Sequence, residues 1–182
     1  MPLSIVSSDE RAGSDPASAL ARPADLVMIS CSDAELARYA LAWHGAGCDL
    51  PALYLAKVQR LLPHPEADLR AAIATARAVL IHLPHGLDDW RRGIEGVAAS
   101  ARDRRIALAV VAAADPADPA LDALSNLPRT TLRRLAALCH RSDARSARAV
   151  LTQLSLAAGL PIAPWLDAPT DAVPELVRGE AR

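Results

Sequence analysis

The chain has 182 residues and a mass of 19.2 kDa, which fits one domain and is too short for two. Its hydrophobic fraction of 52% is enough to bury a core and excludes global disorder. Its formal net charge of -1 argues against a general nucleic-acid binder, whose phosphate contacts need a basic surface.

The two ends of the chain differ in composition from the middle. Residues 1–24 are rich in Ser, Asp, Ala and Pro and lack the apolar core of a signal peptide, so they predict a flexible leader. Residues 161–182 hold Pro161, Pro164, Pro169 and Pro174, a density that predicts a Pro-rich tail. No apolar run is long enough to span a membrane, so we expect a cytoplasmic protein. Residues 25–160 are then the one folded domain.

Apolar runs and helical patterns alternate through this domain. Continuous apolar runs predict buried strands at 25–30, 53–58, 78–83 and 106–112. Helical patterns occupy 33–44, 66–77, 88–105, 120–125, 130–140 and 143–158. This order predicts an α/β fold: an open, mostly parallel four-stranded sheet with helices on both faces, plus additional C-terminal helices.

Two helix starts carry specific signals. Ser32-Asp-Ala-Glu35 matches a capping box, in which the hydroxyl accepts a backbone N–H and the carboxylate reaches back to the cap. The helix predicted from Asp88 to Arg105 has an acidic first turn and a basic last turn, which suits the helix dipole. Asp88-Asp89 therefore has two interpretations, a dipole charge or a carboxylate pair for metal or acid–base chemistry.

Parallel sheets bind ligands at the carboxyl ends of their strands, where the winding direction reverses. In this chain that edge holds the segments 30–32, 59–64, 83–88 and 113–118. No glycine-rich phosphate loop follows a strand and no GxSxG turn is present, so nucleotide sites of those types and a hydrolase elbow are not supported.

The histidines at this edge leave alternatives open. His82 and His85 flank a strand end and are weak candidates for metal or haem ligands, or else a core and a turn residue. His64, before Pro65, either caps a turn or contacts a ligand. The three cysteines are odd in number and lack CxxC spacing, so no disulfide framework or zinc site is expected.

Arginine is strongly over-represented, with 19 Arg against the single lysine Lys57, beside 40 Ala and no Phe. Two explanations are open. One is codon usage in a GC-rich genome, and the other is a surface that binds carboxylates or phosphates. Arg141, Arg145 and Arg148 are spaced four and three apart, as on one helical face, and either bind an anionic ligand or partner or form a solvated face.

Five segments, in order, resemble the N-terminal part of the large subunit of cobaltochelatase, which shares a superfamily with the large subunit of magnesium chelatase. They are Ile29–Trp43, Leu50–Leu69, Ala76–Val111, Asp115–Pro128 and Leu132–Leu160. The resemblance covers most of this chain but only a small part of that longer polypeptide.

The resemblance implies a role in cobalamin biosynthesis. In that family the large subunit binds the tetrapyrrole and the metal ion, and AAA+ subunits hydrolyse ATP to drive insertion. It implies a tetrapyrrole or corrin precursor as ligand, cobalt as the metal, and the remainder of a large subunit or the ATPase subunits as partners. With no nucleophile–base pair or cofactor motif, we expect the chain not to be catalytic alone.

The chain departs from the family's pattern in the loops at the edge of the sheet. After His64-Pro65 the family tends to continue with Met-Ser-Val-Asp-Leu-Tyr, whereas this chain has Glu66–Arg70. After the third predicted strand the family tends to have Gly-Gly and a Tyr-Trp pair, whereas this chain has Pro84-His85-Gly86 and only Trp90. Ala113–Asp115 and Arg141–Arg145 replace two further loop motifs that contain glycine. These changes indicate a retained scaffold with altered contacts.

Three functions remain open at this point. The first is a chelatase head that binds the tetrapyrrole or docks on a partner. The second is a non-catalytic interaction or regulatory protein derived from that head, and the third is a haem or other small-ligand module using His82 or His85. The candidate ligand-binding residues are Ser30, Ser32, His64, His85, Gly86, Trp90, Asp115, Arg141, Arg145 and Arg148.

Overall fold

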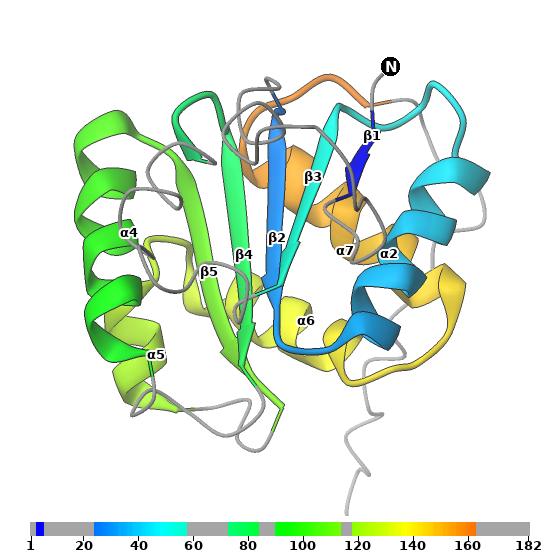
Figure 1. Ribbon diagram of the computed structural model, residues 1–182. Helices are drawn as coiled ribbons and strands as arrows, with labels where there is room; N and C mark the ends of the chain where they lie inside the picture. The colour runs from blue at the N-terminus through cyan, green and yellow to red at the C-terminus, as the bar shows by residue number, and fades with distance from the viewer. Residues whose placement is uncertain (1–2, 6–23, 58–72, 84–89, 114–117, 163–182) are drawn as a thin grey trace, which may run out of the picture.

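The computed structural model describes residues 3–5, 24–57, 73–83, 90–113 and 118–162 (Figure 1). The strands are β1 (Leu3–Ile5), β2 (Leu26–Ser30), β3 (Leu53–Lys57), β4 (Ala78–Leu83) and β5 (Ala107–Ala112). The helices are α2 (Asp33–Gly45), α4 (Arg91–Arg104), α5 (Pro119–Leu124), α6 (Arg129–Cys139) and α7 (Ala144–Ala157).

The strands form one open sheet in the order β1-β3-β2-β4-β5, and every neighbouring pair is parallel. The predicted α/β class, with a parallel sheet between helices and further helices after the last strand, is confirmed. All four predicted strands are present, and the short β1 adds a fifth within the segment expected to be a leader. Its three residues are too short a run to show a strand period, and they pair with β3 from Leu3↔Leu53 to Ile5↔Leu55.

Helices cover both faces of the sheet, as Figure 1 shows. Leu26 and Met28 of β2 pack against α2, α6 and α7, whereas Val27 and Ile29 pack on the side of α4 and α5. This alternation follows from the two-residue period of a strand. Buried side chains on both faces explain why the strands read as continuous apolar runs.

The winding direction reverses between β2 and β4. From β2 the chain passes through α2 to β3 on one side, and β4 then lies on the other side of β2 and leads through α4 to β5. Such a reversal opens a crevice at the carboxyl ends of the two central strands. Ser30 and His82 are register partners at this point.

Helix α4 begins later than predicted. Its N-cap is Trp90, its first turn holds no acidic residue, and Asp88 and Asp89 lie outside the described residues. The predicted acidic first turn is therefore wrong, whereas the basic last turn, with Arg102 and Arg104, is confirmed. Packing explains the start, because the Trp90 indole folds against Gly93, where an added Cβ would lie 2.7 Å from the indole nitrogen.

The outer edge of β5 is paired by side chains instead of a sixth strand. Asn126 Oδ1 accepts from the Leu108 N–H at 2.7 Å, and its Nδ2 donates to the Ile106 carbonyl at 2.7 Å. Ser125 Oγ accepts from the Val110 N–H at 2.9 Å. These bonds satisfy backbone groups that an exposed edge strand would leave open. The helix predicted over 66–77 lies largely outside the described residues, and Ala74–Arg77 are not helical.

The contact between Trp90 and Gly93 yields a stability prediction. Gly93→Ala places a Cβ against a rigid indole, so we expect a loss of about 1–3 kcal/mol in the free energy of unfolding. Gly96→Ala on the same helix is the matched control, since its Cβ meets nothing within 4 Å, and it should stabilise by about 0.5–1 kcal/mol. Denaturant titration measures both, and equal effects of the two variants would refute the packing argument.

Candidate functional site

The site is built where β2 and β4 end and α2 begins. Ser32 is the N-cap of α2, and its Oγ accepts from the Glu35 N–H at 3.3 Å, as the capping box predicted. The second half of that box is wrong, because the backbone N–H of Ser32 donates to Ser30 Oγ at 3.1 Å instead of to a carboxylate. The Glu35 carboxylate is thereby left for contacts with the strands.

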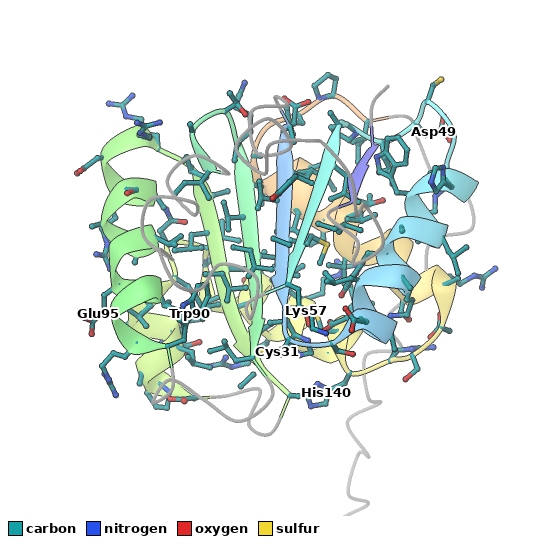
Figure 2. All side chains as sticks on the ribbon, viewed as in Figure 1. Cys31, Asp49, Lys57, Trp90, Glu95 and His140 are labelled. Atoms are coloured by element: carbon teal, nitrogen blue, oxygen red, sulfur yellow. The ribbon has the colours of Figure 1, made fainter. Side chains whose placement is uncertain are left out.

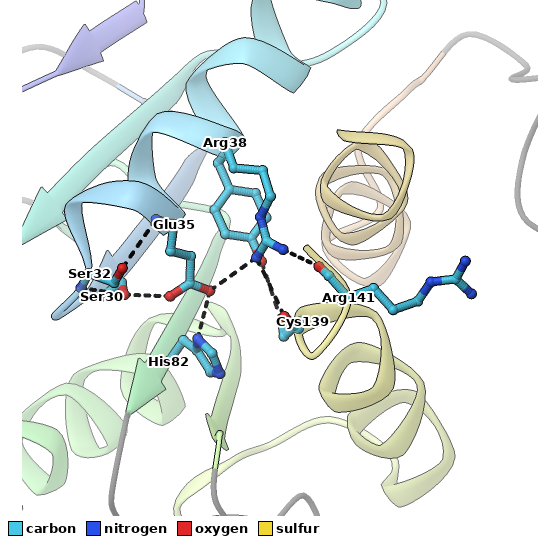
Figure 3. Close-up of polar contacts among 8 residues, drawn as sticks. Ser30, Ser32, Glu35, Arg38, His82, Cys139 and Arg141 are labelled. Atoms are coloured by element: carbon cyan, nitrogen blue, oxygen red, sulfur yellow. Dashed lines mark hydrogen bonds and ion pairs between the residues drawn. The ribbon is translucent and has the colours of Figure 1, made fainter. Parts of the chain in front are cut away.

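Glu35 is the centre of a buried polar cluster (Figure 3). Its Oε2 accepts from Ser30 Oγ at 2.5 Å, and its Oε1 lies 2.6 Å from His82 Nδ1. Arg38, one helical turn further on, places Nη2 3.6 Å from the same Oε1. The Glu35 side chain is only 9% exposed, so one largely buried carboxylate joins β2, β4 and α2.

Burial and partners act on Glu35 in opposite directions. Burial alone raises the pKa of the Glu35 carboxyl, because the charged form loses solvation. The hydrogen bond and charge of His82, the hydrogen bond from Ser30 and the charge of Arg38 together outweigh burial and leave the pKa below its usual value. Glu35 is therefore a carboxylate at neutral pH.

Arg38 connects this cluster to the end of α6. Its guanidinium donates to the main-chain carbonyls of Arg141 and, at 3.4 Å, of Cys139. The Cys139 thiol is 3.5 Å from the Tyr39 hydroxyl, and burial raises its pKa to about 12, so it stays neutral. Contacts from α2 thus hold the segment that follows α6.

A pocket of about 420 Å³ opens beside the cluster. The described residues that line it come from the ends of β2, β4, β5 and α6 and from the start of α2: Ser30, Cys31, Ser32, Ala34, Glu35, Arg38, His82, Ala113, Cys139 and Ser142. This is the crevice that the topology predicts for a ligand.

The carboxylate determines how His82 is oriented. His82 Nδ1 lies 2.6 Å from Glu35 Oε1, and such a close approach requires the proton on Nδ1, because two unprotonated acceptor atoms would repel each other. Nε2 is buried and, like Glu35 Oε1 and Arg38 Nε, has no hydrogen-bond partner among the described residues. A histidine held by a carboxylate also resembles the outer contact of a metal-bound imidazole. The described residues, however, contain no group of three or more His, Cys, Asp or Glu side chains placed to hold a metal ion.

The structure brings together three of the residues predicted from sequence, namely Ser30, Ser32 and the metal candidate His82. Trp90 instead packs in the core on the α4 side of the sheet. His64, His85, Gly86 and Asp115 lie outside the described residues.

The three arginines predicted to share one helical face do not do so. Arg141 precedes α7, its side chain is 62% exposed near Asp143, and it serves the site only through its main-chain carbonyl. Arg148 Nη2 pairs with Asp49 Oδ2 at 3.1 Å, and Arg145 is exposed in the first turn of α7. The helical spacing fails because Asp143 caps α7 and starts the helix after Arg141.

Sequence reasoning missed Glu35, Arg38 and Cys139 as parts of the site. The sequence pattern explains Glu35 by the helix cap alone. The i, i+3 spacing of Glu35 and Arg38 was the signal that the two side chains share one face of the helix and can pair. The position of His82 on the α2 side of the sheet was the second signal, since the preceding residues on that face, Ala78 and Leu80, are apolar.

The comparisons with known proteins point to one kind of protein. The chain is 37% identical to the aerobic cobaltochelatase subunit CobN of Pseudomonas aeruginosa over 108 residues, which are 58% of this chain and 9% of that protein. The fold is similar to the catalytic subunit of cobaltochelatase from Mycobacterium tuberculosis, with a TM-score of 0.59 and 22% identity over 80% of this chain and 11% of that one.

These matches confirm the resemblance to a part of the cobaltochelatase large subunit. The chain spans about a tenth of the length of either relative. No protein-family model matches it. In the part of the chain that the structure describes, no helix has the length and apolar character needed to cross a membrane.

The buried position of Glu35 yields a prediction for stability and its pH dependence. Glu35→Ala leaves Arg38 and His82 without their carboxylate, so we expect a loss of about 3–5 kcal/mol in the free energy of unfolding at pH 7. Because the folded pKa is below the reference value of 4.5, this stabilisation is present above pH 4.5 and is lost as the pH falls through the folded pKa. The gap between wild type and variant should therefore close in acid.

Glu95→Ala is the control for this measurement, since Glu95 is 52% exposed and lies 4.0 Å from Arg91 in an i, i+4 pair. Loss of such a surface pair costs less than about 1 kcal/mol. Urea unfolding at pH 7 and at stepwise lower pH measures both variants. A Glu35→Ala gap that matches the Glu95→Ala gap, or that persists unchanged in acid, would contradict the role assigned to Glu35.

Proposed function

We propose that this chain acts as a ligand-contacting head of a cobaltochelatase-type machine in cobalamin biosynthesis. The observation that carries the proposal is the 37% identity to an aerobic cobaltochelatase subunit. The fold similarity to a cobaltochelatase catalytic subunit supports it across 80% of the chain. The ligand in this proposal is a tetrapyrrole or corrin precursor, and cobalt is the ion that the whole machine inserts.

The pocket between β2, β4 and α2 is the contact that the chain brings to this function. It lies where parallel sheets bind ligands, and it holds polar groups from Ser30, Glu35 and His82. The thiol of Cys139 at this pocket stays neutral, because burial raises its pKa to about 12. Binding, with chemistry carried out elsewhere in the assembly, is the role that this arrangement supports.

Contact with further segments of a large subunit is the second part of the proposal. A segment equal to about a tenth of its relatives leaves the rest of a large subunit to be supplied by other chains or other regions. Docking on that remainder, or on AAA+ ATPase subunits, is part of the proposal. A purely regulatory or interaction protein is the second candidate.

A spectroscopic titration tests the first candidate against the second. The purified chain is mixed with a corrin precursor and, separately, with a porphyrin, and the ring absorbance is recorded. We expect a saturable band shift at tens of micromolar. A spectrum that stays the sum of its parts excludes ring binding. A pull-down with ATPase subunits and the remaining large-subunit segments then decides whether docking alone is retained, and absence of both results rejects the proposed function.

A further inference from the structure

Four exposed arginines gather at the edge of the sheet where β4 and β5 begin, opposite the edge that holds the pocket. Arg77 directly precedes β4, and the other three lie at the end of α4: Arg102, Arg104 and Arg105. The main chain brings the two groups together, because the Ala107 N–H of β5 donates to the Arg77 carbonyl at 3.0 Å. We call these four residues the arginine cluster.

The positive charges of the arginine cluster have no carboxylate partner among the described residues. Three of the side chains each donate to one main-chain carbonyl, and the Arg105 side chain forms no hydrogen bond or ion pair within the same residues. A guanidinium carries five N–H donors, so most donors of the cluster remain available. In the described part of the chain, Asp25 and Asp103 lie at this edge without pairing to the cluster, and an excess of positive charge is left there.

Arg105 occupies a backbone conformation that favours glycine. Its φ of 58° and ψ of 39° are left-handed, at the residue where α4 ends. A Cβ is disfavoured in this region, so glycine at this position would give a more stable fold. Local strain of this kind is offset where the side chain makes a functional contact.

The chain itself contains a segment of opposite charge. Residues 163–177, which lie outside the described residues, hold three acids, Asp167, Asp171 and Glu175, and no Lys, Arg or His. Successive acids are four residues apart, so the negative charge is spread along the segment as the arginines are spread along the edge of the sheet.

The described part of the chain ends close to the arginine cluster. Arg77 Nη2 donates to the Ala158 carbonyl at 3.4 Å, and Ile162, the last described residue, follows four residues later. Figure 1 shows the segment after α7 and the end of α4 at the same end of the strands. An extended chain advances about 3.3–3.6 Å per residue, so Asp167 can reach up to about 18 Å from Ile162.

Apolar side chains are available on both sides of such a contact. Leu156, in the last turn of α7, is 56% exposed, and Leu160 is only partly buried. The segment 163–177 carries Trp165 and Leu166 directly before its first acid. Burial of apolar surface adds affinity that ion pairs between exposed side chains alone do not supply.

We propose that residues 163–177 dock on the arginine cluster of the same chain, with their three acids facing the guanidinium groups. The docked segment covers the edge of the sheet opposite the pocket, so the pocket stays open to a ligand. The inference does not depend on the proposed function, and its test uses neither a tetrapyrrole nor a partner chain.

Paramagnetic relaxation in the full chain tests this contact. A nitroxide is attached through Ala172→Cys, in a background where the two accessible cysteines are replaced as Cys31→Ser and Cys48→Ser. Cys139 stays in place, because its thiol is buried and neutral and does not react with the label.

We expect the nitroxide to broaden the backbone amide signals of Arg77 and Arg105. The signals of Ser32 and Ala34, at the pocket, should keep their width. The broadening should largely disappear in about 1 M salt, where charges are screened over roughly 3 Å.

Variants separate the charges from the fold. Replacing all three acids, as Asp167→Asn, Asp171→Asn and Glu175→Gln, should remove most of the broadening. Arg105→Gly should reduce the broadening at the cluster while raising the Tm by about 2–4 °C, because it relieves the left-handed backbone. Arg145→Gln changes an exposed arginine of α7 and is the matched control, which should leave the broadening unchanged.

A mixed sample identifies the chain that supplies the segment. Nitroxide-labelled chain without nitrogen-15 is mixed with nitrogen-15 chain without nitroxide, and broadening in this mixture would assign the contact to a second copy and overturn the inference. Broadening that is absent from the single chain, is centred on the pocket, or survives removal of the three acids also overturns it. Equal effects of Arg105→Gly and Arg145→Gln would do the same.

Discussion

One buried carboxylate organises the functional end of this molecule. The Glu35 carboxylate accepts a hydrogen bond from Ser30 of β2 and pairs with His82 of β4 and with Arg38 of its own helix. Three elements therefore meet at one charged group. A charge placed out of water is costly unless every partner is present. The site therefore exists only when β2, β4 and α2 are all in their native positions, and the orientation of His82 follows from that.

Arginine plays a structural role that composition alone did not reveal. Arg38, Arg77, Arg102 and Arg104 each donate to main-chain carbonyls of segments distant in sequence. These carbonyls include those of Cys139 and Ala158, at or next to the ends of α6 and α7, where a helix leaves acceptors unpaired. A planar guanidinium with several donors suits this task better than lysine does. Part of the arginine excess thus holds elements together; Figure 2 shows the described side chains on the ribbon.

The sequence predicted the architecture well because the responsible signals are local or repeat along the chain. Apolar runs predict β2 to β5 within one residue of their observed ends. Strands that are buried on both faces are apolar at every position, so each run begins and ends where the strand does. The short β1 and the start of α4 at Trp90 were missed because pairing with β3 and packing on Gly93 determine them. Both depend on tertiary contacts that no local pattern contains.

The edge of the sheet where the pocket lies could be predicted from the sequence, but the side-chain contacts beside the pocket could not. The edge that holds Ser30 and Ser32 follows from topology, whereas the arginines predicted to bind an anion lie in or near α7, and the arginine that lines the pocket is Arg38. The sequence pattern places Glu35 in a capping motif, and its backbone N–H does bind the cap. Its carboxylate instead contacts the Ser30 hydroxyl and the His82 ring, and not the backbone N–H of the cap. These contacts depend on the register between β2 and β4, which places Ser30 opposite His82.

The central claim is that Glu35 fixes the proton of His82 on Nδ1, the ring nitrogen that lies 2.6 Å from Glu35 Oε1. Nitrogen-15 NMR of the histidine-labelled chain at neutral pH tests this claim directly, because the two ring nitrogens give distinct shifts in each tautomer. The account predicts a protonated Nδ1 in wild type and a loss of that preference in Glu35→Ala. A wild-type His82 that carries its proton on Nε2 alone would contradict it.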